Sequence, residues 1–200
     1  MTPILDHPDI IRLAGALRSR APALHPDAAM RRAAVALIFR AGVAAGSEPE
    51  LLFIKRAEYP GDPWSGQIAF PGGRREPQDE SLEQTVIRET REETGIDLTT
   101  QGEILGQLDE LRPQSVRLPE IVVCPFAAVV YEPPMLTLTS EVAAAFWLPL
   151  QSLRSAESWR DTEVIARGFQ MTRRAFHHEG NVIWGITERI IAGLLGLFEE

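Results

Sequence analysis

The segment 70–96 constrains this chain more than any other part of its sequence. It joins a Pro-Gly-Gly loop to a predicted helix that carries Glu89, Glu92 and Glu93. Residues three and four apart lie on the same side of an α-helix, so these carboxylates would repel one another. A bound cation would offset that repulsion, and carboxylate oxygens favour a hard divalent ion such as Mg²⁺.

The sequence also predicts where this helix begins and ends. Ser81 followed by Gln84 is the signature of a capping box and predicts the start of the helix. Gly95 predicts its end, because glycine readily adopts the left-handed conformation that closes many helices. Leu82 and Val86 are the apolar residues expected to face the core.

The remaining elements predict a mixed α/β (α+β) fold, with a mixed sheet between helices and further helices at both ends of the chain. An amphipathic helix is expected over 8–20, followed by a proline-containing linker, so 1–29 reads as an appendage to a main domain at 30–200. Apolar runs predict the other elements. Strands are expected at 33–40, 50–55, 67–70, 103–111, 121–131 and 144–148, two short strands within 162–184, and a C-terminal helix at 186–198.

Composition excludes several classes of function. The formal net charge of −8 argues against a broad basic face for nucleic acid. The single cysteine, Cys124, lies in an apolar run, which predicts a buried side chain and suits a reducing compartment. With no recognisable secretion signal and no apolar run of membrane-spanning length, a cytoplasmic location without membrane contact is expected.

The same segment resembles the Nudix box, in which a glycine, a glutamate, an Arg-Glu pair, a Glu-Glu pair and a glycine follow at set spacings. Here Glu80 is followed after seven residues by Arg88-Glu89, then by Glu92-Glu93 and Gly95-Ile96. The resemblance implies the Nudix fold and hydrolysis of a diphosphate linkage, with 30–200 as the hydrolase domain.

The box departs from the family pattern at two places. Six residues rather than five separate Gly73 from Glu80, so the loop is read as one residue longer. Thr90 stands where an aliphatic residue is usual.

Neighbouring segments are similar to the coenzyme A diphosphatase subgroup of this family. The similarity covers Ser65–Gly73, Leu51–Ala57, Glu141–Leu150 and Ile183–Thr187. Gly61 stands near the place where the subgroup has a second arginine, so one substrate contact of the subgroup is missing here.

The resemblance implies roles for the residues of the box. Glu89 and Glu93 are expected to bind Mg²⁺ or Mn²⁺ directly, and Glu92 to bind a further ion or to orient a water molecule on the metal. A backbone carbonyl of the glycine loop, that of Gly72 or Gly73, would add a ligand. Arg88 would orient a glutamate of the box, and Glu80 is the expected partner.

The sequence leaves more than one candidate for the general base and for the residues that contact the substrate. Family members place the base differently, so Glu89 and Glu141 are both candidates, with Glu120 as a weaker one. Arginine grips phosphate oxygens well, and flanking positions make Arg56, Arg74 and Arg75 candidates for binding substrate phosphates. Further open candidates are Arg112 and Arg117, and Trp64 as a pocket wall or as packing under its loop.

The expected function is therefore a metal-dependent hydrolase of a nucleotide-diphosphate substrate. Resemblance favours coenzyme A or acyl-coenzyme A, cleaved to 4′-phosphopantetheine and 3′,5′-ADP. The alternatives are a related diphosphatase acting on ADP-ribose, NADH or dinucleoside polyphosphates, and a non-catalytic nucleotide-binding module. Monomer and homodimer both remain open.

Overall fold

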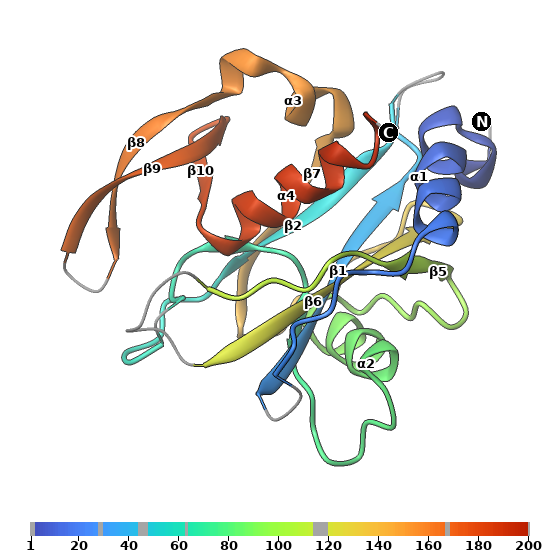
Figure 1. Ribbon diagram of the computed structural model, residues 1–200, viewed down its shortest axis with the longest axis horizontal. Coiled ribbons are helices and arrows are strands. Elements are labelled where there is room, and N and C mark those ends of the chain that lie inside the picture. Colours follow the sequence, from blue (N-terminus) through green and yellow to red (C-terminus); the bar gives the residue numbers. More distant parts are fainter. Residues whose placement is uncertain are drawn as a thin grey trace.

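A seven-stranded mixed sheet forms the centre of the molecule (Figure 1). The computed structural model describes residues 3–27, 30–43, 48–62, 64–113, 120–166 and 169–199. The strand order is β3-β2-β1-β6-β5, with β4 paired to β1 and β7 paired to β2. Strands β1 and β6 run parallel, and the other pairs are antiparallel. The strands are β1 (Arg31–Arg40), β2 (Glu50–Arg56), β3 (Ile68–Ala69), β4 (Gly72–Arg74), β5 (Gly102–Gln107), β6 (Ile121–Val130) and β7 (Val142–Pro149).

Within the described residues, four α-helices pack around this sheet, and the expected mixed fold is confirmed. They are α1 (Pro8–Ser19), α2 (Leu82–Thr94), α3 (Leu150–Arg154) and α4 (Ile186–Gly196), with short 3₁₀ turns at Ile4–Asp6 and Ala156–Ser158. Helix α3 follows directly after Pro149, where the sequence analysis placed only the end of a strand.

The expectation of two short strands within 162–184 is wrong. Three strands form a separate antiparallel sheet: β8 (Trp159–Ala166), β9 (Phe169–His178) and β10 (Asn181–Trp184). The turn between β9 and β10 has positive φ angles at both Glu179 (47°) and Gly180 (82°). Two such residues form the tight turn of a two-residue hairpin. Asn-Gly or Asp-Gly at this place would have been a stronger sequence signal for the hairpin than Glu-Gly.

Strand β1 is buried on both faces, which explains its nearly continuous apolar sequence. Leu37 and Phe39 belong to the same core cluster as Leu13 of α1 and Ile190 of α4. The alternate residues Ala36 and Ile38 pack in the cluster that contains Val86 of α2. The sheet therefore separates α2 on one face from α1 and α4 on the other, as Figure 1 shows.

Helix α2 begins and ends where the sequence predicts. The Ser81 hydroxyl accepts a hydrogen bond from the Gln84 amide at 3.1 Å. Gly95 adopts a φ of 77°, and its N–H donates to the Arg91 carbonyl. These caps fix the length of the helix that carries the glutamates, and Val86 fixes its position on the sheet.

The N-terminal segment is tied to the main domain by polar contacts as well as by apolar packing. Asp9 of α1 forms an ion pair with Arg154 of α3 at 2.7 Å. The linker amide of Ala23 donates to Asp109 at 2.7 Å. The division of the chain at 29/30 stays a prediction, since residues 28 and 29 lie outside the described parts.

Cys124 of β6 is fully buried, as expected. Its thiol donates a hydrogen bond to Glu110 at 3.2 Å, and burial raises the pKa of this thiol. Within the described parts, no helix has the length and apolar character needed to cross a membrane.

Replacing Val86 by alanine should weaken the contact between α2 and the sheet. Two buried carbon atoms are lost from a fully buried side chain, and this costs roughly 2 kcal/mol of unfolding free energy. Urea unfolding of Val86→Ala and of the exposed control Glu83→Ala would measure it. Equal midpoints for the two variants would contradict this view of the interface.

Candidate functional site

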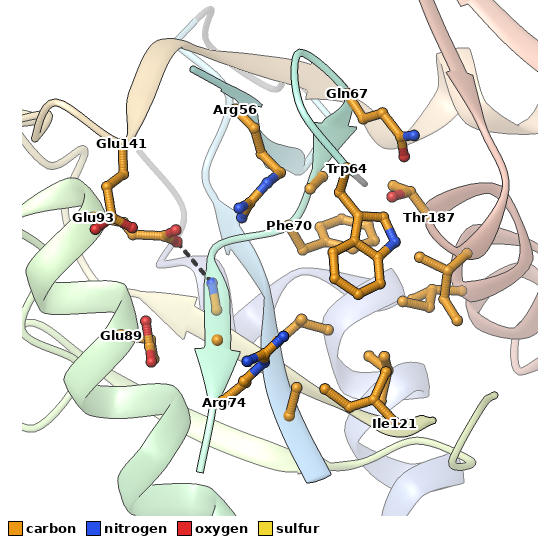
Figure 2. A pocket seen from close by; sticks show the side chains of 18 of the residues that line it. Arg56, Trp64, Gln67, Phe70, Arg74, Glu89, Glu93, Ile121, Glu141 and Thr187 are labelled. Atoms are coloured by element: carbon orange, nitrogen blue, oxygen red, sulfur yellow. Dashed lines mark hydrogen bonds between the residues drawn. The ribbon is translucent and has the colours of Figure 1, made fainter. Parts of the chain in front are cut away.

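A cavity of about 430 Å³ opens beside β1, β4, the box helix α2 and the start of α4. Figure 2 shows Glu89, Glu93 and Glu141 at one end, Trp64, Gln67 and Thr187 at the other, and Arg56 and Arg74 between them. The cavity thus joins an acidic region to a largely apolar wall. Its charged lining residues are Arg56, Asp62, Arg74, Glu76, Arg88, Glu89, Glu92, Glu93 and Glu141, and its apolar ones include Val35, Trp64, Phe70, Ile121 and Ile190.

Arg88 organises the acidic end of this cavity. Its guanidinium donates to Glu89 at 3.0 Å and to Glu92 at 3.1 Å, so it draws two of the box glutamates together. It also donates to the backbone carbonyl of Arg74 at 3.1 Å, which links α2 to the end of β4.

The principal partner of Arg88 is Asp79, and the prediction that Glu80 fills this role is wrong. Arg88 grips both carboxylate oxygens of Asp79, at 3.0 and 2.9 Å. Asp79 is only 5% exposed and also accepts from the hydroxyl of Thr85 and the amide of Glu76, each at 2.9 Å. The hydrogen bonds from Arg88 hold the pKa of Asp79 well below its usual range.

Glu80 instead lies on the surface and accepts a hydrogen bond from Gln84 at 3.3 Å. Five residues separate Gly73 from Asp79, which is the family spacing. The extra residue therefore lies after Asp79, before the helix, and the loop has its ordinary length up to the buried acid.

The glycine loop approaches both α2 and β1 too closely for a side chain. A Cβ on Gly73 would lie 2.4 Å from the carboxylate carbon of Glu89. A Cβ on Gly72 would lie 2.2 Å from the carbonyl oxygen of Ala34, and its φ of 147° also favours glycine. This close approach lets the Gly72 amide donate to Glu93 at 2.8 Å.

The pKa values of two carboxyl groups at the acidic end are raised, which indicates that this end favours a cation. Burial raises the pKa of Glu93 to about 7, although the Gly72 amide lowers it; the charges of Glu89 and Glu141 raise it further. Burial also raises the pKa of Glu89, opposed by Arg88 and reinforced by Glu92 and Glu141. A divalent ion would reverse these effects, because it stabilises the ionised carboxylates.

The donor chemistry of this end fits Mg²⁺ or Mn²⁺, which take oxygen ligands. Glu89, Glu93 and the loop residue Gly73 border the same cavity and could supply them. No ready-made cluster of three or more His, Cys, Asp or Glu ligands occurs within the described residues. Glu92 contacts Arg88 and is 57% exposed, so its use as a ligand requires the side chain to turn away from that arginine.

The two principal candidates for the general base both line the cavity, whereas the weaker one does not. Glu89 accepts from Arg88, and Glu141 precedes β7 and points toward Glu93 in Figure 2. Glu120 is 81% exposed and contacts Arg112 at 3.4 Å. Arg117 lies outside the described residues.

The three arginines expected to bind phosphate lie in different settings. Arg56 borders the cavity and pairs with Asp62 at 2.8 Å. Arg74 borders the cavity from the end of β4. Arg75 donates instead to the backbone carbonyls of Asp79 and Glu80, each at 3.0 Å, and so holds the loop.

Sequence reasoning missed Asp62 and Asp79, and left the role of Trp64 open. Trp64 is half-buried and lines the cavity, so the indole forms part of the pocket wall. Counting five intervening residues forward from Gly73 leads to Asp79, whereas counting seven intervening residues back from Arg88 leads to Glu80. The first count would have identified Asp79. No local signal marks Asp62 as the partner of Arg56.

Thr187 shows how the C-terminal element completes the site. Its hydroxyl donates to the carbonyl of Ile68 at 3.0 Å, which ties the start of α4 to β3. A glycine loop, a carboxylate-bearing helix and cavity-facing arginines thus meet at one cavity beside this mixed sheet.

One domain-family model and two related proteins identify the family of this chain. The NUDIX domain model matches residues 29–168. The chain is 32% identical over 169 residues to an "Uncharacterized Nudix hydrolase NudL" of Yersinia pestis, covering 84% of this chain and 80% of that protein. A protein of the same description from Photorhabdus laumondii is 36% identical over 130 residues, covering 64% of this chain and 66% of that protein, just under two thirds of its length. The chain therefore belongs to the Nudix hydrolase family.

Solved structures agree on the fold. A MutT/nudix family protein from Enterococcus faecalis matches with a TM-score of 0.53 and 18% identity, over 90% of this chain and 64% of that chain. An Ap4A hydrolase from C. elegans, crystallised as a binary complex, matches with a TM-score of 0.50 and 26% identity, over 64% of this chain and 88% of that chain.

The variants Asp79→Asn and Glu80→Gln separate the two neighbouring acids. Removing the charge of Asp79 leaves a partly buried Arg88 without its main partner, which should cost roughly 3 kcal/mol of unfolding free energy. Glu80→Gln should change it by less than about 0.5 kcal/mol, since that side chain is exposed. Chemical denaturation of both proteins measures the difference, and a larger loss in Glu80→Gln would overturn the assignment.

Stability without metal should fall as pH rises through about 7. In the unfolded chain Glu93 has an ordinary pKa of 4.5, whereas its pKa in the folded protein is about 7. The folded state therefore gains stability from protonated Glu93 below pH 4.5. This contribution is lost as the pH rises from 4.5 to about 7. The full difference corresponds to roughly 3 kcal/mol. Glu93→Gln should remove this part of the pH dependence.

Mg²⁺ should therefore raise the melting temperature more at pH 8 than at pH 5, where Glu93 is protonated in the metal-free protein. Thermal melts with EDTA or with Mg²⁺ at both pH values test this. An equal Mg²⁺ effect in wild type and Glu93→Gln at pH 8 would show that Glu93 does not bind the ion.

Proposed function

We propose that this protein is a metal-dependent hydrolase of nucleoside-diphosphate-linked substrates, and that coenzyme A or acyl-coenzyme A is the substrate. The observation that carries the proposal is the composition of the cavity. Its acidic end suits a metal and a diphosphate, and Arg56 and Arg74 lie between that end and the apolar wall. A long substrate with a charged centre and an apolar arm would match the order of acidic end, arginines and apolar wall along the cavity.

Hydrolysis forms a bond between a water oxygen and one phosphorus and breaks the bond from that same phosphorus to the bridging oxygen, which leaves with the other phosphate. A divalent ion at Glu89 and Glu93 would offset the negative charge of the diphosphate. Arg56 would hold oxygens of the diphosphate, and Arg74 would hold a further phosphate of the substrate. A carboxylate takes the proton of the attacking water, and the contacts favour Glu141, because Glu89 already accepts from Arg88.

The segments that resemble coenzyme A diphosphatases meet at this cavity. Gln67 comes from the Ser65–Gly73 segment, Glu141 from the Glu141–Leu150 segment and Thr187 from the Ile183–Thr187 segment. These segments are far apart in the chain, so their convergence on one cavity supports a shared role in binding the substrate. Gly61, where the subgroup match fails, lies outside the cavity lining.

A panel of coenzyme A, 3′-dephospho-coenzyme A, ADP-ribose, NADH and dinucleoside polyphosphates decides the substrate. With Mg²⁺ or Mn²⁺, we expect coenzyme A to give 4′-phosphopantetheine and 3′,5′-ADP, separated by chromatography, with the highest kcat/KM of the panel. A higher value for another member would replace coenzyme A as the substrate. Tight binding to one member without turnover of any would indicate a binding module.

The variants Glu89→Gln and Glu93→Gln test the acidic end on whichever substrate is turned over. Each should lower kcat/KM by about 100-fold or more, since even residues that only support metal ligands are worth 10–100-fold. Glu83→Gln on the exposed side of the same helix is the matched control and should retain activity. Near wild-type rates in both cavity variants would refute the proposed metal site.

A further inference from the structure

A second cavity of about 540 Å³ adjoins the first one and is strongly basic. Four arginines, Arg31, Arg32, Arg74 and Arg75, line it together with Glu76. Arg74 and Glu76 also line the main cavity, so the two spaces share a border. In a protein with a net charge of −8, such a gathering of arginines indicates a local site for an anion.

Strand pairing brings these arginines together from distant parts of the sequence. Ala33 of β1 pairs with Arg74 of β4, and the Arg75 amide donates to the Arg32 carbonyl at 3.0 Å. On the other side of β1, Arg31 pairs with Ile121 of β6. The start of β1 therefore lies between the end of β4 and the start of β6.

The alternation of side chains places Arg31 on the face of the sheet that lines the main cavity. Ala33 and Val35 line that cavity, and alternate residues of a strand point to the same face. Ile121, the neighbour of Arg31 on β6, lines it as well and lies near Arg74 in Figure 2. Arg31 thus continues the wall of the main cavity beyond its edge.

The four arginines differ in how far they are already engaged. Arg32 pairs with Glu110 at 3.3 Å, and Arg75 donates to the carbonyls of the loop. Arg31 and Arg74 are exposed residues, and their guanidinium groups make no hydrogen bond or ion pair with any residue that the structure describes. The charge of Arg74 acts on Asp62 and helps to lower its pKa. The carboxylate of Glu76 accepts a hydrogen bond from Gln78.

We propose that Arg31 and Arg74 form a subsite for a phosphate monoester carried by the substrate. A phosphate monoester has close to two negative charges at neutral pH and three acceptor oxygens, which suits two arginine forks. The inference rests on the proposed function, under which a diphosphate lies at the acidic end. The 3′-phosphate on the ribose of coenzyme A is the monoester that this subsite would read.

The direct test is the binding of 3′,5′-ADP and 5′-AMP, two nucleotides that differ by this phosphate, to the full chain with Mg²⁺ by calorimetry. Wild type should bind 3′,5′-ADP about tenfold more tightly than 5′-AMP, because one exposed charge-assisted contact contributes about that much to affinity. Arg31→Gln should bring the ratio of affinities close to one. Arg12→Gln, an exposed arginine on α1 outside both cavities, is the matched control and should keep the wild-type ratio.

Equal affinity of wild type for the two nucleotides, or an unchanged ratio in Arg31→Gln, would overturn the subsite. Because the assay measures binding, it does not depend on turnover. Loss of the preference in Arg31→Gln without hydrolysis of coenzyme A would support the subsite and refute the proposed substrate. Hydrolysis of coenzyme A and 3′-dephospho-coenzyme A with the same kcat/KM in wild type would support the activity and refute the subsite.

Discussion

The paired hydrogen bonds between Arg88 and Asp79 hold the candidate site together. Asp79 ends the glycine-loop segment and Arg88 lies in the middle of α2, so this pair fixes the loop against the helix. From that fixed position Arg88 reaches Glu89 and Glu92, and the loop brings the Gly72 amide to Glu93. A planar guanidinium is needed because it serves three carboxylates and a backbone carbonyl at once, which an ammonium group cannot do with the same geometry.

Strand β1 gives this assembly its setting. One face packs against α2, and the other contributes Ala33 and Val35 to the cavity wall. Its partner β4 is only three residues long and consists of both loop glycines and Arg74, so the loop is part of the sheet. The same strand places Arg31 beside the cavity. One element thus positions the helix that carries the glutamates, the glycine loop and the cationic groups proposed to hold the substrate.

Local signals in the sequence predicted the parts of the fold that depend on neighbouring residues. The capping box and Gly95 gave the bounds of α2, and apolar runs gave most of the central strands. The β8–β10 sheet was missed in part because a Glu-Gly turn is a weak hairpin signal. Asp79 was missed because two spacing rules, one counted from Gly73 and one from Arg88, conflict at an inserted residue. Burial decides between them, since only the acid inside the loop can pair with Arg88.

By itself, the sequence determined the family pattern and the helix that carries the glutamates, and it led us to expect a cation among them. These follow from the identity and spacing of residues within one segment of the chain. Only the tertiary structure decided that Asp79 supports Arg88, that Asp62 engages Arg56, and that Arg31 lies on the same cavity face as Arg74. Each of these depends on contacts across strands or loops, and strand register and burial are set by packing of the whole sheet between its helices.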